Sequence, residues 1–292
     1  MFYKNKSYRT FYWFNAVLLA VIALVCVLPL VHIWAVSFSS SAAANANIVT
    51  LWPIDFTTDA YLKTLANSNF GKSIIVTVQR TLLGTAIGMA ITVASAYSLS
   101  KPANEFKGRT LYVWLFVFTM LFSGGLIPGY ILIQKLHLMN TLWALLLPGF
   151  VNVWNMILML NFYRALPKEL EEAAFMDGAG YMRVLWSVYL PISLPAIATL
   201  SLFTMVGHWN AWFDGLIYMT QSERWPLATL LQSIIVGADF TRISLNPTDL
   251  VNISERTVKA AQIFISLLPI VAVYPFIQRY FVNGIVIGAI KE

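Results

Sequence analysis

The sequence predicts an all-α membrane protein with six transmembrane helices and both termini in the cytoplasm. Hydrophobic residues make up 59% of its 292 residues and charged residues only 11%, whereas soluble domains are usually about 25% charged. Six stretches without Asp, Glu, Lys or Arg are each long enough for the roughly 20 apolar residues of a spanning helix. This composition excludes a soluble enzyme, a disordered protein and a nucleic-acid-binding module.

The charge-free stretches place the helices in order. They predict spans near residues 12–38, 73–99, 110–132, 140–163, 186–208 and 258–281. The first apolar run, from Phe11 to Phe38, is far longer than the core of a signal peptide, and no well-placed cleavage site follows it. We therefore expect the first span to remain as an anchor.

The basic residues predict the orientation, because Lys and Arg are enriched in cytoplasmic loops. One set of loops and ends carries eleven of them: Lys4, Lys6, Arg9, Lys101, Lys107, Arg109, Arg164, Lys168, Arg183, Arg279 and Lys291. The other set carries seven, and Arg80 falls within a span. The larger set is expected on the cytoplasmic side, with both termini.

This orientation divides the chain into two regions. Residues 1–72 are expected to form an anchor helix and a first external segment, and residues 73–292 a transmembrane core. The core would carry a cytoplasmic loop at 164–185 and a large external segment at 209–257. We expect the external segment to be folded, with a helix or two, because it keeps apolar runs such as 227–236.

Polar and small residues inside the spans are candidates for helix packing or for a transport path. The second span carries a stripe of small residues at spacings of three and four: Thr77, Thr81, Gly84, Gly88, Thr92 and Ser95. Such a stripe lets helices approach closely, although it could also line a pore. Arg80, in the same span, reaches to the external headgroups or lies before the point where the membrane begins. The alternative is that it contacts an anionic substrate or a partner subunit.

The fourth span carries Asn152, Trp154 and Asn155. The two amides could bind sugar hydroxyls beside the stacking surface of the tryptophan, or they could bond helix to helix. His32 and His208 have no partner at metal-ligand spacing, and the only cysteine, Cys26, gives neither a disulfide nor a metal site. We found no phosphate-binding loop and no nucleophile motif, so no catalytic residue, metal or cofactor is expected on this chain.

The loop at 164–185 predicts a short helix outside the membrane. Pro167 suits a helix start, three glutamates suit the first turn, and Gly178 can end the helix. Ala173, Ala174 and Ala179 keep one surface small. Pro191 and Pro195 are expected to break or kink the entry to the fifth span.

The run Glu172-Ala-Ala-x-x-Asp177-Gly-Ala, with Leu190-Pro191 and Pro195 downstream, resembles the E-A-A loop of permease subunits of binding-protein-dependent ABC importers. Leu185 stands where many members have Phe, a conservative apolar change. The resemblance implies a type I ABC importer permease fold in a bacterial inner membrane. It also implies that the loop couples to a cytoplasmic ATPase through Glu169, Glu171, Glu172, Ala173, Ala174, Asp177, Gly178, Ala179 and Arg183. In it Glu172 would face a basic residue, and Ala173 and Gly178 would permit close packing.

Further stretches resemble the carbohydrate branch of this family, with maltose-type and alginate-type permeases among its members. They are Ala96–Ser100, His208–Asp214 and Arg279–Lys291. The resemblance implies a heterodimer with a second permease, two ATPase subunits that hold ATP and Mg²⁺, and an extracytoplasmic sugar-binding protein. Oligosaccharide would pass by alternating access along Arg80, Asn152, Trp154, Asn155, Trp209 and Asn210. An importer of amino acids or peptides is the alternative, and a stand-alone secondary transporter or membrane enzyme is more remote.

Overall fold

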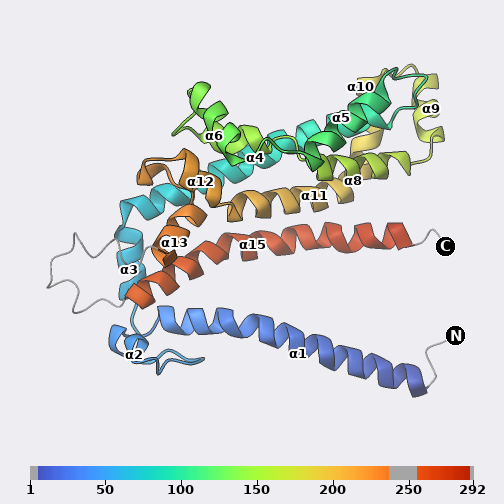
Figure 1. Cartoon of the computed structure of the whole chain (residues 1–292). Helices are drawn as coiled ribbons and strands as arrows, with labels where there is room; N and C mark the ends of the chain where they lie inside the picture. Colours follow the sequence, from blue (N-terminus) through green and yellow to red (C-terminus); the bar gives the residue numbers. More distant parts are fainter. Residues whose placement is uncertain (1–5, 237–254, 290–292) are drawn as a thin grey trace. The chain divides into compact units, whose positions relative to one another are not determined.

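The computed structural model describes residues 6–236 and 255–289, which form helices joined by loops, with no strand among them (Figure 1). The chain divides into two compact units. The first combines Met1–Phe70 with Leu231–Pro269, and the second combines Gly71–Leu230 with Ile270–Glu292. The division of the sequence into 1–72 and 73–292 stays a prediction.

The first unit contains α1, α2, α3 and the beginning of α15. Their bounds are Lys6–Ser37, Ser41–Asn45, Asp59–Ala66 and, for the whole of α15, Glu255–Ala289. A small apolar cluster joins Ala35 and Val36 of α1 to Ala43 and Ala44 of α2 and to Ala260 of α15. Such small side chains allow close backbone approach.

The guanidinium of Arg256 strengthens this part of the first unit. It donates to the carbonyl oxygen of Ala44 at 3.2 Å and to the side-chain oxygen of Asn47. The beginning of α15 therefore holds the end of α2 and the turn that follows it.

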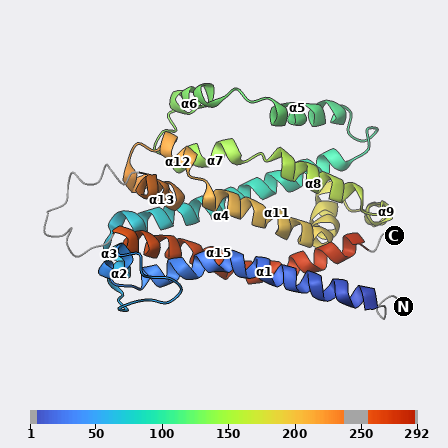
Figure 2. The ribbon, with the colours of Figure 1, turned by 60° about the horizontal axis from the view of Figure 1, so that its bottom comes forward.

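The second unit is built on three long elements that run side by side, α4, α8 and α11 (Figures 1 and 2). Its elements are α4 (Ser68–Ser100, which begins just before the unit), α5 (Arg109–Leu121), α6 (Leu126–Lys135), α7 (Leu142–Leu146), the 3₁₀ turn Leu147–Gly149, α8 (Val153–Arg164), α9 (Glu169–Met176), α10 (Tyr181–Val184), the π-helical turn Leu185–Tyr189, α11 (Leu190–Asn210), α12 (Phe213–Tyr218), the 3₁₀ turn Ser222–Arg224 and the start of α13 (Leu227–Val236). Their shared core gathers at the α9 end of this unit, and it includes Met89, Val93, Ala96, Met156, Met159, Leu160, Val184 and Leu200.

Among the described residues, four helices are long and apolar enough to span a membrane: Tyr8–Ser37, Ser68–Ser100, Tyr181–Asn210 and Arg256–Val273. Two bent pairs raise the number to six if each pair is one span. The stretches predicted as continuous helices at 110–132 and 140–163 are therefore interrupted. The first bends by 110° between α5 and α6, and the second by 45° before α8.

Local chemistry explains the first interruption. Gly124 and Gly125 separate α5 from α6, and Gly125 has a φ of +87°, which residues with a Cβ rarely adopt. Hydropathy alone does not register this break, because glycine and the residues around it remain uncharged.

The prolines of the fifth span do not break it, and a kink there stays a prediction. The chain stays helical from Tyr181 to Asn210. Pro191 lies in the first turn of α11, close after the π-helical turn, and Pro195 lies in the interior of α11. Wider turns of this kind accommodate backbone irregularity within a helix.

The predicted external segment at 209–257 is folded where the structure describes it. It contains α12, a 3₁₀ turn and α13, which confirms the expected short helices. Its part from 237 to 254 lies outside the described residues, as do Lys4 and Lys291 from the orientation argument.

Candidate functional site

The loop at 164–185 folds as predicted into a short helix, α9. Its three glutamates lie in the first turn, where carboxylates are favoured by the positive end of the helix dipole. Gly178 ends the helix with a φ of +79°. Its N–H donates to the carbonyl of Phe175 at 2.9 Å, and that of Ala179 to Ala174 at 3.0 Å.

Gly178 serves this turn through its backbone conformation. No atom of the described chain lies within 4 Å of a Cβ built at this position. Close packing inside the chain therefore does not require a glycine here. The left-handed φ, by contrast, favours glycine strongly.

The predicted coupling residues do not all lie on one surface. Glu171 points into the chain, and Ala174 and Ala179 are half-buried. The remaining ones are exposed: Glu169, Glu172, Ala173, Asp177, Gly178 and Arg183. Exposed apolar side chains accompany them, and Met176 and Met182 are 87% and 71% exposed. A protein partner could cover this surface, which combines carboxylates with flexible methionines.

Glu171 forms a buried ion pair with Lys101, which directly follows α4. The two side chains are only 15% and 7% exposed. The hydroxyl of Tyr189, in the π-helical turn, donates to the second oxygen of Glu171 at 2.6 Å. The ammonium of Lys101 also lies 4.0 Å from the ring centre of Tyr97 and 4.9 Å from that of Tyr189, within cation–π range.

Basic side chains also cap the end of α4. Arg164 donates to the carbonyl of Leu99 at 3.2 Å, and Arg109 donates to that of Lys101 at 3.0 Å. Cations are favoured at the carboxyl end of a helix. From the sequence, Lys101, Arg109 and Arg164 were used only to predict the orientation, and these contacts were missed. The signal that could have indicated them is a basic residue directly after a span.

Arg80 lies at the other end of the second unit and is 3% exposed. Its guanidinium forms an ion pair with Asp214 of α12, with one bond of 3.1 Å, and donates to the carbonyl of Ala211 at 3.2 Å. The interpretation that it reaches to headgroups is therefore wrong. Its charge is already met by a carboxylate of the same chain, which leaves contact with an anionic substrate without support.

The small-residue stripe of α4 is mostly buried, including Thr77, Thr81, Gly84 and Thr92. It packs within the chain: the ring of His208 lies against Gly84, where an added Cβ would come within 2.5 Å of it. The stripe thus serves helix packing, and His208 is a packing residue.

The two asparagines of the fourth span are engaged in structure. The side-chain oxygen of Asn152 accepts the N–H of Asn155 at 3.0 Å and caps α8. The side-chain amide of Asn155 donates to Thr204 of α11 at 3.0 Å. Trp154 is 59% exposed and Asn152 is exposed as well, whereas Asn155 is buried.

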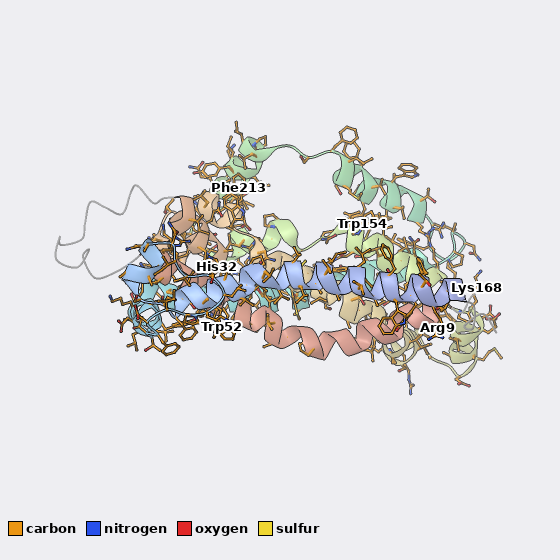
Figure 3. The ribbon with its side chains drawn as sticks, turned by 90° about the horizontal axis from the view of Figure 1, so that it is seen from below. Arg9, His32, Trp52, Trp154, Lys168 and Phe213 are labelled. Atoms are coloured by element: carbon orange, nitrogen blue, oxygen red, sulfur yellow. The ribbon has the colours of Figure 1, made fainter. Side chains whose placement is uncertain are left out.

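Trp154 lies between the two ends of the second unit. Figure 3 shows it between Phe213, at the α12 end, and Lys168, at the α9 end. Trp209 is half-buried and Asn210 exposed at the end of α11. Among the described residues, no group of three His, Cys, Asp or Glu side chains could hold a metal ion.

Known proteins resemble this chain over nearly its whole length. Residues 2–287 match the family described as binding-protein-dependent transport system inner membrane component. Protein LplC of Bacillus subtilis (strain 168) is 38% identical over 289 residues, 99% of this chain and 97% of that protein. The polygalacturonan/rhamnogalacturonan transport system permease protein YtcP of the same strain is 37% identical, with 94% and 95% covered.

A solved structure also resembles this chain. The crystal structure of a bacterial ABC transporter involved in the import of the acidic polysaccharide alginate contains a chain that is 33% identical. The two chains superpose with a TM-score of 0.86 over 96% of this chain and 100% of the other. The fold, the loop after α8 and these matches agree, and the chain belongs to the family of inner membrane components of binding-protein-dependent transport systems.

Proposed function

We propose that this chain is a permease subunit of an ATP-driven oligosaccharide importer and that its cargo is rich in uronic acids. One observation carries the proposal, namely the full-length similarity to a chain of the alginate importer, with a TM-score of 0.86 at 33% identity. The relative that transports polygalacturonan and rhamnogalacturonan supports the same cargo class, because polygalacturonan, like alginate, is built from uronate sugars.

The importer would lie in the bacterial cytoplasmic membrane and contain several proteins. This chain would pair with a second permease, two ATPase subunits would hold ATP and Mg²⁺, and an extracytoplasmic protein would deliver the sugar. ATP binding would favour the outward-open pore and hydrolysis would reset it, because a ligand shifts such an equilibrium only by favouring one state.

Within this assembly, the exposed surface of α9 would dock on the ATPase. Glu172 would meet a basic residue there, while Ala173 allows close approach. Glu171, by contrast, would act inside the permease, because its carboxylate is bound to Lys101 and Tyr189.

The transport path would use the side chains that the fold leaves available. Trp154 offers an exposed indole face, on which the apolar face of a sugar ring can stack. Trp209 and Asn210 would lie near the external end of the path. Asn155 and Arg80 would support its walls, because both side chains are buried and bonded within the chain. Asn152 is exposed beside Trp154 and would contribute to the path.

Reconstitution tests the proposed cargo. Proteoliposomes would hold this chain, the permease encoded beside it and the ATPase, and ATP hydrolysis would be recorded with the binding protein and a panel of oligosaccharides. We expect uronate oligosaccharides to stimulate hydrolysis and neutral ones to have little effect. Stimulation by neutral sugars alone would overturn the uronate assignment, and stimulation only by amino acids or peptides would move the cargo to another class.

A charge reversal tests the docking surface. Glu172→Lys should abolish uptake while the chain still inserts and assembles with its partner permease. The matched control is Lys72→Met, which alters an exposed ion pair with Glu223 outside the loop and should keep uptake. Normal uptake by Glu172→Lys would refute the docking role of this residue.

A further inference from the structure

Two ion pairs tie α4 to other elements of the second unit, and the basic side chain of each pair is buried. Lys101 pairs with Glu171 of α9 directly after the helix, and Arg80 pairs with Asp214 of α12. Lys101 and Arg80 are 21 positions apart, which corresponds to about 31 Å at 1.5 Å per residue. Figures 1 and 2 both show α9 and α12 at opposite ends of α4.

We propose that α4 is a strut that transmits movement between α9 and α12. Lys101, directly after the last residue of α4, and Arg80, 12 positions after its first residue, are the positioning residues that fasten α4 to them. The proposal rests on the proposed function in so far as α9 meets an ATPase; it does not depend on the cargo. In this proposal the four residues of the two ion pairs act in coupling without contacting either the sugar or the ATPase.

The inner joint is rigid because every charge in it has a partner. One oxygen of Glu171 meets Lys101 and the other accepts from Tyr189. The hydroxyl of Tyr97, near the end of α4, donates to the carbonyl of Tyr181 at 3.1 Å, so that α4 also holds the start of α10. A shift of α9 relative to α4 would leave a buried charge without its partner, which is strongly unfavourable.

The outer joint has two levels. Besides the Arg80 pair, the hydroxyl of Thr77 accepts the N–H of Leu227 at 2.7 Å and donates to the carbonyl of Ser73. Thr229 donates to the carbonyl of Trp212 at 2.7 Å and so joins the start of α13 to the segment before α12. The external segment is thereby tied to successive turns of α4.

The element between the joints suits a strut. α4 is one helix of 33 residues without an internal proline. The segment from Tyr181 to Asn210 connects the same two ends covalently, but it contains the π-helical turn and Pro195. Such irregularities are where helices bend, so the uninterrupted α4 is the stiffer link.

The experiment measures whether nucleotide binding to the ATPase changes the accessibility of α12. Cys26 is the only cysteine, so Cys26→Ser removes every thiol from this chain, and cysteine-free partner subunits complete the background. Leu216→Cys then places a thiol on α12, where the native side chain is 48% exposed. The rate of maleimide labelling is recorded in the reconstituted complex without nucleotide and with ATP and vanadate.

Paired neutral substitutions open each joint without leaving a single charge buried. The inner variant is Lys101→Met with Glu171→Gln, and the outer variant is Arg80→Met with Asp214→Asn. We expect either to reduce the nucleotide-dependent change in labelling rate at least fivefold, in complexes that still assemble and hydrolyse ATP at the basal rate. The control Lys72→Met removes an exposed ion pair of the same helix, with side chains 49% and 65% exposed, and should keep the full change.

Combining the inner and outer variants decides whether they act through one element. If α4 is the strut, the combined variant loses no more of the response than either alone, because the path is already broken. Losses that multiply, a response that persists in both variants, or an unmodified complex without a nucleotide response would each overturn the proposal. A nucleotide response without stimulation by uronate sugars would instead leave the strut in place and refute the proposed cargo.

Discussion

The imidazole of His208 lies where a side chain on Gly84 would stand, with its Nε2 atom 2.5 Å from the position of a Cβ built there. α4 and α11 can approach this closely only because residue 84 has no side chain. Small residues have this role in membrane helices, where lipid offers no hydrophobic drive for association.

Gly84→Ala should therefore destabilise the packing of α4 on α11. Overpacking of this kind typically costs about 1–3 kcal/mol, visible as a lower melting temperature of the purified chain in detergent. Gly71→Ala, in the same helix with nothing within 4 Å of its added Cβ, is the control and should be neutral or slightly stabilising. Adding His208→Ala should restore most of the loss, and equal melting of the two alanine variants would contradict the packing role.

Thr77→Val should destabilise the joint between α4 and α13. Valine keeps the shape but leaves the N–H of Leu227 without its acceptor, and an unsatisfied buried group costs about 1–3 kcal/mol. Thr119→Val is matched to it, because this exposed hydroxyl only donates to a carbonyl of its own helix. Thermal melting compares the two, and a loss of the same size in Thr119→Val would argue against the contact.

Asn155→Ala and Thr204→Ala should weaken the same contact between α8 and α11, because the two side chains are bonded to each other at 3.0 Å. Helix-to-helix hydrogen bonds in membranes contribute about 0.6 kcal/mol on average. In a double-mutant cycle of melting temperatures, the double variant should lose less than the sum of the single ones. Full additivity would show that the two residues act independently.

Substitutions of Gly178 distinguish two reasons for a glycine in the loop, namely its left-handed backbone conformation and close approach by the ATPase. Because its φ is +79° and its surroundings in the chain are open, Gly178→Asn should retain more transport than Gly178→Val, since asparagine tolerates the left-handed region better. Uptake in proteoliposomes gives the comparison. Equal loss in both variants would show that the missing side chain matters for close approach by the ATPase instead.

The helical regions were predictable because they depend on local composition. Charge-free stretches located the long apolar helices, and the glutamates and Gly178 located α9 with its end. The interruption at Gly124 and Gly125 has a local signal too, but a hydropathy criterion does not weigh backbone conformation. Glycine there matters for its φ, not for its polarity.

The contacts of the candidate site were not predictable from the chain alone. Arg80 and Asp214 are 134 positions apart, and Lys101 and Glu171 are 70 apart. The sequence shows that these charges exist, but their pairing depends on how the helices pack in three dimensions. For the same reason Asn155 suggested a sugar path, whereas packing engages it with Thr204 of α11.

The contacts of Arg256 have a consequence for biosynthesis. The ribosome makes the amino-terminal part of the chain first, so the first anchor is complete long before the last span emerges. The carbonyl of Ala44 has no guanidinium donor until Arg256 is synthesised 212 residues later. The alanines around Ala44 likewise cannot pack against Ala260 before that residue is made. The first unit therefore matures at the end of translation, and a nascent chain arrested before residue 256 should present this turn open to proteases at the membrane surface.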